Sequence, residues 1–162
     1  MYRNYRLFLK LLTIFSAFGI IAFSTADVQA QISVVVSKKS GVDVKKLEAS
    51  DLREIFLGAK LKWPNGRKIQ VIDQPATLAG RAFYKVFLKK TYKQSRQRWL
   101  KLALSGQASG PRRVESDDEV KALLKRQKNA IGFIRTEKLD DTLEEIFRVD
   151  VKLKSSSDKK QN

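Results

Sequence analysis

Anion recognition is the chemistry for which this sequence offers the clearest candidate residues. Thr77 stands at the start of a predicted helix, where unpaired backbone N–H groups favour a bound anion. Arg81 follows about one turn later and could supplement those donors. A second candidate is the loop of residues 106–113, GQASGPRR, because such turns can aim several N–H groups at one oxyanion. Its expected contact residues are Ser109, Gly110, Arg112 and Arg113.

Each of these candidates also has a plainer structural explanation that the sequence leaves open. Thr77 could serve only as a helix N-cap, and the two arginines of the loop could simply be exposed. Arg81, Lys85 and Lys89 recur at every fourth position of the same predicted helix. This stripe is either the solvated face of an amphipathic helix or a basic surface that binds a polyanion.

The residue types that the sequence lacks exclude several function classes. There is no histidine and no cysteine, which excludes histidine-assisted hydrolysis, histidine metal ligands and disulfides. We find no group of carboxylates or lysines typical of an active site. We therefore expect a binding protein and not an enzyme, with no cofactor and no metal. Trp63 and Trp99 are expected in the core and not as ligand platforms.

The charge of the chain points to anionic partners. Its 162 residues include 33 Lys and Arg but only 17 Asp and Glu, a net charge of +16. A field of this size draws anions to the surface, although it also keeps a protein soluble by self-repulsion.

The N-terminal residues are typical of a secretory signal peptide. The first ten residues carry three Arg or Lys and no acid, and residues 11–23 form a 13-residue uncharged run. Small residues precede a predicted cleavage point after Ala30. A membrane anchor is the alternative, but a spanning helix needs about 20 apolar residues. We expect export to the periplasm, a domain at residues 31–151, and a disordered polar tail at residues 152–162.

Strands and helices are expected to alternate along this domain. The predicted strands are residues 32–36, 68–72, 130–134 and 145–151. The predicted helices start at Asp51, Thr77, near Ser95 and at Ser116, and the first and third end at Gly58 and Gly106. Asp51 and Ser116 resemble the N-caps of capping boxes, each with a Glu three residues later. This order predicts an α/β fold with a mixed sheet flanked by helices.

Two stretches together resemble a known family. The run LREIFLGAKLKWPNGRKIQVI, residues 52–72, is followed about 60 residues later by NAIGFI, residues 129–134. In this order and spacing they resemble the phosphate-binding proteins of ABC transporters, and more closely their short periplasmic relatives. The resemblance implies one lobe, or a truncated form, of a type 2 periplasmic binding protein. A complete member is about twice this length, so either the lobe works alone or a partner supplies the other side of the cleft.

The resemblance also implies where phosphate contacts would lie. The family has an Arg, then Ser-Gly-Thr at a helix N-terminus, then an aromatic residue. Setting Phe83 on the aromatic residue places Thr77 on the Ser and Asp73 on the Arg. Asp73 would repel a dianion unless it accepts a proton-bearing oxygen. In the first case Asp73→Asn raises phosphate affinity, and in the second it abolishes binding.

Two function classes follow from these observations. The first is a periplasmic solute-binding module that takes phosphate or another small oxyanion for transport or sensing, with a membrane component of an ABC transporter or a second lobe as partner. The second is an envelope accessory protein that binds a polyanion or a partner protein through its basic helices. Binding of the second kind should weaken steeply with salt, because counterions are released.

Overall fold

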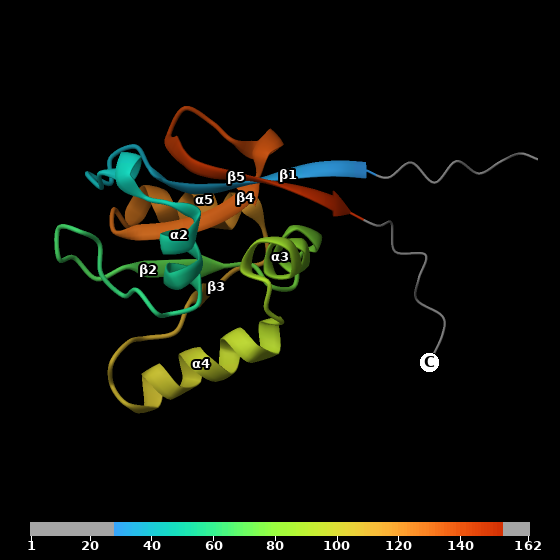
Figure 1. Ribbon diagram of the computed structural model, residues 1–162. Helices are drawn as coiled ribbons and strands as arrows, with labels where there is room; N and C mark the ends of the chain where they lie inside the picture. The colour runs from blue at the N-terminus through green and yellow to red at the C-terminus, as the bar shows by residue number, and fades with distance from the viewer. Residues whose placement is uncertain (1–27, 154–162) are drawn as a thin grey trace, which may run out of the picture.

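The computed structural model describes residues 28–153, in which five strands form one mixed sheet in the order β3-β2-β4-β1-β5 (Figure 1). The strands are β1 (Val28–Ser37), β2 (Gln70–Asp73), β3 (Arg112–Arg113), β4 (Ala130–Arg135) and β5 (Leu143–Leu153). β2 runs parallel to β3 and β4, whereas β1 runs antiparallel to β4 and β5. The predicted α/β class with a mixed sheet is confirmed.

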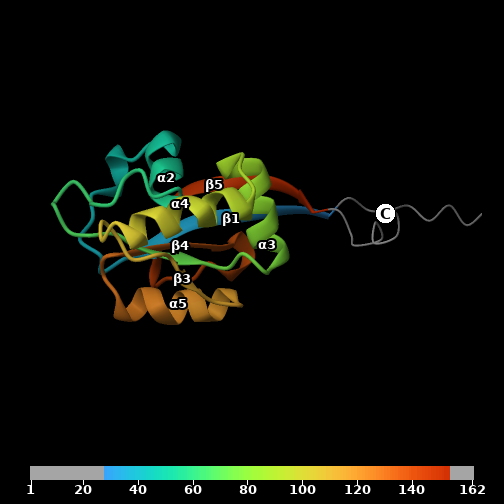
Figure 2. The same cartoon turned by 90° about the horizontal axis from the view of Figure 1, so that it is seen from below.

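Helices cover both faces of this sheet. They are α2 (Ala49–Phe56), α3 (Leu78–Ala82), α4 (Tyr92–Leu104) and α5 (Asp117–Arg126), with short 3-10 turns η2 (Val44–Lys46) and η4 (Thr136–Lys138). Figure 2 shows α5 on one side of the sheet and α2, α3 and α4 on the other. None of the helices in the described residues is both long and apolar enough to cross a membrane.

The central strand β4 and residues 32–36 of β1 are almost continuously apolar because both sheet faces are covered there. Side chains alternate between faces along a strand, so Ile32, Val34 and Val36 join the core under α2 and α3, while Val35 joins the smaller core under α5. Gly132 of β4 belongs to the α5 face, where a Cβ would come within 2.8 Å of Val120 Cγ1.

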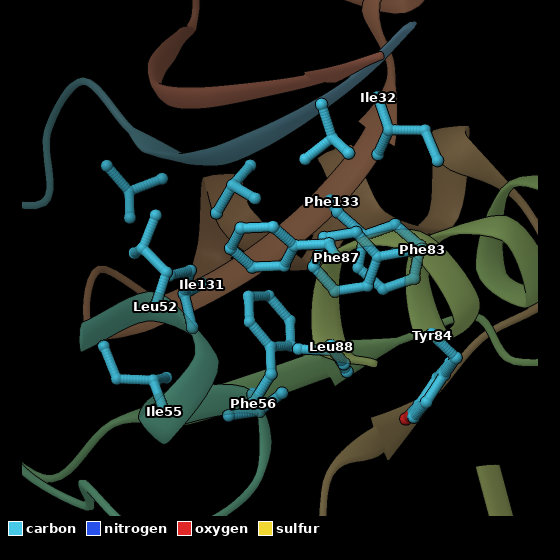
Figure 3. Close-up of a cluster of buried hydrophobic side chains, with 14 of the residues drawn as sticks. Ile32, Leu52, Ile55, Phe56, Phe83, Tyr84, Phe87, Leu88, Ile131 and Phe133 are labelled. Atoms are coloured by element: carbon cyan, nitrogen blue, oxygen red, sulfur yellow. The ribbon is translucent and has the colours of Figure 1, made fainter. Parts of the chain in front are cut away.

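Aromatic side chains form the centre of the larger core (Figure 3). The rings of Phe83 and Phe133 stack with their centroids 4.1 Å apart, and Phe56 meets Phe83 edge-on at 5.0 Å. Tyr84 lies at the border of this cluster with its hydroxyl pointing away from it (Figure 3). The packing of this core therefore places the Tyr84 hydroxyl near the end of β2.

A π-helix, η3 (Phe83–Leu88), continues directly from α3 and changes which side chains are buried. Val86, four residues after Ala82, is 42% exposed. The wider π turn rotates the helix after Phe83, so that Tyr84 and Leu88 are buried instead.

Several element ends differ from the sequence prediction. α2 starts earlier than expected: Glu48 is the N-cap, and Asp51 is its capping-box partner at the third position. β1 begins at Val28 because residues 28–30 pair with the end of β5, which runs to Leu153 and not to residue 151. Most of the predicted signal peptide and of the predicted tail lies outside the described residues.

α4 is attached mainly through one tryptophan. Among its residues only Ser95 and Trp99 are buried. Trp99 Nε1 donates to the carbonyl oxygen of Phe56 at 3.0 Å, and its ring packs on Gly58, where a Cβ would stand 3.2 Å from it. Both tryptophans are buried, as predicted.

Candidate functional site

The carboxyl ends of β2 and β3 open into a small cavity with both polar and apolar lining residues. It has a volume of about 250 Å³ and lies between these strand ends, η3 and α4. Its polar lining comes from Asp73, Tyr84, Tyr92, Ser95, Arg96 and Arg113, with Gly110 at its edge. Ligands of open α/β sheets bind outside the carboxyl ends of parallel strands, so this cavity is the candidate site.

Asp73 lies at the base of the cavity and is 2% exposed. Tyr84 Oη donates to Asp73 Oδ2 at 2.6 Å, while Oδ1 has no hydrogen-bond partner among the described residues. Burial raises the pKa of Asp73 to about 6, against the opposing effects of the Tyr84 hydrogen bond and the charge of Arg113. The same burial, together with the Asp73 charge, raises the pKa of Tyr84. Asp73 therefore offers an unused acceptor that is ionised at neutral pH.

The first turns of α4 supply two further unpaired polar atoms. Thr91 and Gln94 form a capping box that starts the helix at Tyr92. The hydroxyls of Tyr92 and Ser95 are both buried, and neither makes a hydrogen bond of good geometry within residues 28–153, although Ser95 lies close enough to Tyr84 to lower the pKa of that tyrosine. Buried polar groups are nearly always satisfied. Three unpaired atoms around one cavity can therefore be completed by a polar ligand or by water.

Arg113 brings a positive charge to the same cavity. It stands beside Asp73 in the β2–β3 register, and its guanidinium lies 5.5 Å from the centroid of the Tyr92 ring. None of the ion pairs in the described part of the chain uses Arg113. Its donors are therefore available to an anion.

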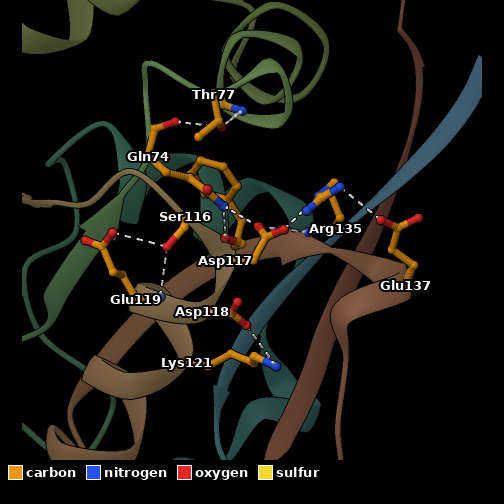
Figure 4. Close-up of polar contacts among 11 residues, drawn as sticks. Gln74, Thr77, Ser116, Asp117, Asp118, Glu119, Lys121, Arg135 and Glu137 are labelled. Atoms are coloured by element: carbon orange, nitrogen blue, oxygen red, sulfur yellow. Dashed lines mark hydrogen bonds and ion pairs between the residues drawn. The ribbon is translucent and has the colours of Figure 1, made fainter.

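Thr77 and Arg81, the first predicted candidates, are placed elsewhere. Thr77 Oγ1 accepts from Gly80 N at 2.9 Å and donates to the carbonyl oxygen of Gln74 at 3.0 Å (Figure 4). Its hydroxyl is thus occupied as an N-cap. Arg81 Nη1 donates to the carbonyl oxygen of Ala76 at 2.6 Å.

The hollow next to Thr77 already contains a compensated carboxylate. Asp117 is buried there and accepts from Gln74 Nε2 at 2.9 Å and from Arg135 Nε at 2.7 Å (Figure 4). Gln74 also donates to the carbonyl oxygen of Phe133 at 2.8 Å. These bonds join the starts of α3 and α5 to the end of β4, and they leave an anion at Thr77 facing a carboxylate.

The remaining predicted residues divide between the cavity and the surface. All four loop residues are exposed; Gly110 and Arg113 line the cavity, whereas Ser109 and Arg112 do not. Arg81, Lys85 and Lys89 share an open depression next to the cavity, and Tyr84 and Tyr92 contribute to both. The stripe predicted as a basic surface thus lies beside the candidate site.

Tyr84, Tyr92 and Ser95 were missed as site residues by sequence reasoning. Their positions depend on the π turn and on α4 starting at Tyr92, a few residues earlier than predicted. The Thr91–Gln94 capping box was the available signal for that start.

Comparisons with known proteins agree with this architecture. No family model matches the chain, and no curated protein is significantly similar to it. A solved structure described as a phosphate ABC transporter substrate-binding protein from Clostridium perfringens, with bound phosphate, superposes with a TM-score of 0.58 at 16% identity. The chain has the fold of a binding-protein lobe. The match covers 73% of this chain and 44% of that one, so the chain spans less than half the length of its neighbour.

A second neighbour is an ABC-type phosphate transport receptor from Vibrio cholerae, with a TM-score of 0.48, 20% identity and coverage of 73% and 46%. Both neighbours are binding proteins and not enzymes. At 16% identity the C. perfringens comparison establishes the fold alone, and it confirms the predicted resemblance to one lobe of a periplasmic binding protein.

Proposed function

We propose that this chain is a solute-binding module of the periplasm that takes a small, proton-bearing oxyanion such as phosphate into the Asp73 cavity. The observation that carries the proposal is the set of three buried, unpaired polar atoms around that cavity, on Asp73, Tyr92 and Ser95. The bound phosphate of the C. perfringens neighbour supports the same kind of ligand.

The mixture of donors and an acceptor defines the chemistry of the ligand. Tyr92, Ser95 and Arg113 can donate hydrogen bonds to oxyanion oxygens. An ionised Asp73 can only accept, so the ligand must bring a proton to Oδ1. Phosphate keeps at least one proton at neutral pH and sulfate keeps none, so the cavity should favour phosphate.

Weak affinity is expected of this chain alone. The cavity offers only two arginines, Arg96 and Arg113, as charged donors, and the chain corresponds to less than half of its neighbour. We therefore expect a dissociation constant of roughly 0.1–1 mM, improved when a second lobe or a transporter component closes over the site. Such a module would serve phosphate transport or sensing.

Calorimetric titration with phosphate and with sulfate at pH 8 tests the proposal. The wild-type chain should bind phosphate and not sulfate. Asp73→Asn should lose phosphate binding, because an amide either turns its N–H donors towards the proton of the ligand or offers it only an uncharged oxygen. Thr77→Val is the matched control, since Thr77 lies at the other hollow. Loss of binding in Thr77→Val with full binding in Asp73→Asn would move the site to the helix N-terminus and refute the proposal.

Export is part of the same proposal. It rests on the basic start, the apolar run and the small residues before Ala30. Mass spectrometry of the protein recovered from the periplasm should show a chain beginning at Gln31. A membrane-bound form that retains Met1 would contradict it.

A further inference from the structure

The crossover from β2 to β3 has an unusual charge composition. Residues 74–114 contain no Asp and no Glu but ten Lys and Arg. These are Arg81, Lys85, Lys89, Lys90, Lys93, Arg96, Arg98, Lys101, Arg112 and Arg113. None of them takes part in the seven ion pairs of the described residues, which use Lys46, Lys60, Lys121, Arg135 and Arg148. The positive charge of this segment is therefore uncompensated.

The same segment holds the exposed large apolar side chains of the described part of the chain. They are Leu78, Val86, Leu100 and Leu104, and Leu104 is 80% exposed. Leu100 and Leu104 lie one turn apart on α4 and so share a side. At helical spacing this side also carries Lys93, Gln97 and Lys101, all exposed and opposite Trp99. We call these five residues the outer face of α4.

We propose that the outer face of α4 docks on an anionic lipid surface. A helix that lies on a membrane combines Lys and Arg for headgroups with leucines that enter the acyl boundary. The outer face has both, and α4 contains no acid. The acidic first turn of α5 lies on the far side of the sheet from α4, so this orientation keeps it away from the lipid (Figure 2).

Other occupants fit the outer face less well. A nucleic acid would use the cations, but it gives two exposed leucines no aromatic or apolar partner comparable to an acyl layer. A second copy of this chain would bring the same large positive charge and be repelled.

A site-specific fluorescence titration tests the docking. The chain has no cysteine, so Gln97→Cys accepts one environment-sensitive dye on the outer face, and Asn65→Cys accepts it in the turn after Trp63 as a control. With vesicles containing phosphatidylglycerol, the dye at position 97 should shift to the blue while the dye at position 65 stays unchanged. Equal shifts at both positions, an equal response to neutral phosphatidylcholine vesicles, or a response only to a short oligonucleotide would overturn the proposal.

Matched variants distinguish docking through the outer face from long-range attraction by the net positive charge. In the Gln97→Cys background, Lys93→Gln with Lys101→Gln should weaken vesicle binding about 5-fold per cation, since each contributes ~1 kcal/mol near such a surface. Leu104→Ser should weaken it at unchanged charge. Lys38→Gln with Lys39→Gln removes two exposed cations elsewhere. An equal loss in that control would show long-range attraction only and refute the docking face. Leu100 of the outer face also borders the Asp73 cavity and is left unchanged, and none of the substituted residues lines that cavity, so phosphate binding is scored independently.

Discussion

Asp73 and Arg113 are register partners in the parallel pair β2–β3, although 40 positions separate them in the sequence. Paired residues of neighbouring strands point to the same sheet face, so the carboxylate and the guanidinium share one cavity. Arg113 offsets part of the rise in the pKa of Asp73 that burial causes. This pairing combines an acceptor and a cationic donor at the candidate site.

The raised pKa of Asp73 predicts a pH-dependent stability difference. Because the folded pKa of about 6 exceeds the ordinary aspartate pKa of 3.8, the folded state binds more protons between these pH values. Stability from this residue therefore falls as pH rises from about 4 to 6, by roughly 3 kcal/mol. Asp73→Asn should raise the unfolding free energy at pH 8 and change it little at pH 4. Urea unfolding of both proteins at the two pH values measures this, and an equal difference at both would contradict it.

Removing either unpaired hydroxyl is predicted to weaken phosphate binding and to stabilise the ligand-free protein. Ser95→Ala and Tyr92→Phe each remove a buried oxygen that has no partner among the described residues. Each should raise the ligand-free unfolding free energy by about 1 kcal/mol and weaken phosphate binding by roughly 10-fold. Thermal unfolding and calorimetry on the same samples would check both effects. Loss of stability in both variants would show that the hydroxyls are satisfied in the folded protein.

Two adjacent arginines allow a test of local against long-range charge. Both are exposed, but Arg113 lines the cavity and Arg112 of the same strand does not. Arg113→Gln should weaken phosphate binding by about 10-fold or more, and Arg112→Gln should leave it nearly unchanged. A similar loss in the two titrations would mean that the arginines act only through the net charge.

Gly80 is predicted to be essential for the segment that follows Asp73. A Cβ at this position would overlap the carbonyl group of Gln74, part of the backbone. Gly80→Ala should therefore destabilise the protein by about 3 kcal/mol or more. Gly110→Ala is the control, because nothing lies within 4 Å of a Cβ there. Chemical denaturation of both should separate them clearly, and equal midpoints would show that the chain around Gln74 can move aside.

The fold could be predicted from the sequence, but the candidate site could not. The β-branched runs around Val34 and Ile131 are long enough to mark buried strands, and the caps at Thr77 and Ser116 are local signals. The cavity depends on long-range pairing of Asp73 with Arg113 and on the π turn at Tyr84. Neither leaves a local pattern, so the helix N-terminus at Thr77 was the more visible candidate.

The attachment of α4 by Trp99 has an optical consequence. Trp99 is one of two tryptophans in the chain and lies on α4, the helix that also presents Tyr92 and Ser95 to the cavity. Its indole N–H donates to the carbonyl oxygen of Phe56 on α2. Ligand that tightens α4 against the body must change the surroundings of this indole. The emission spectrum of the unlabelled chain is therefore an intrinsic probe of the cavity, with Trp63, held by its own bond to Asn129, as the internal reference.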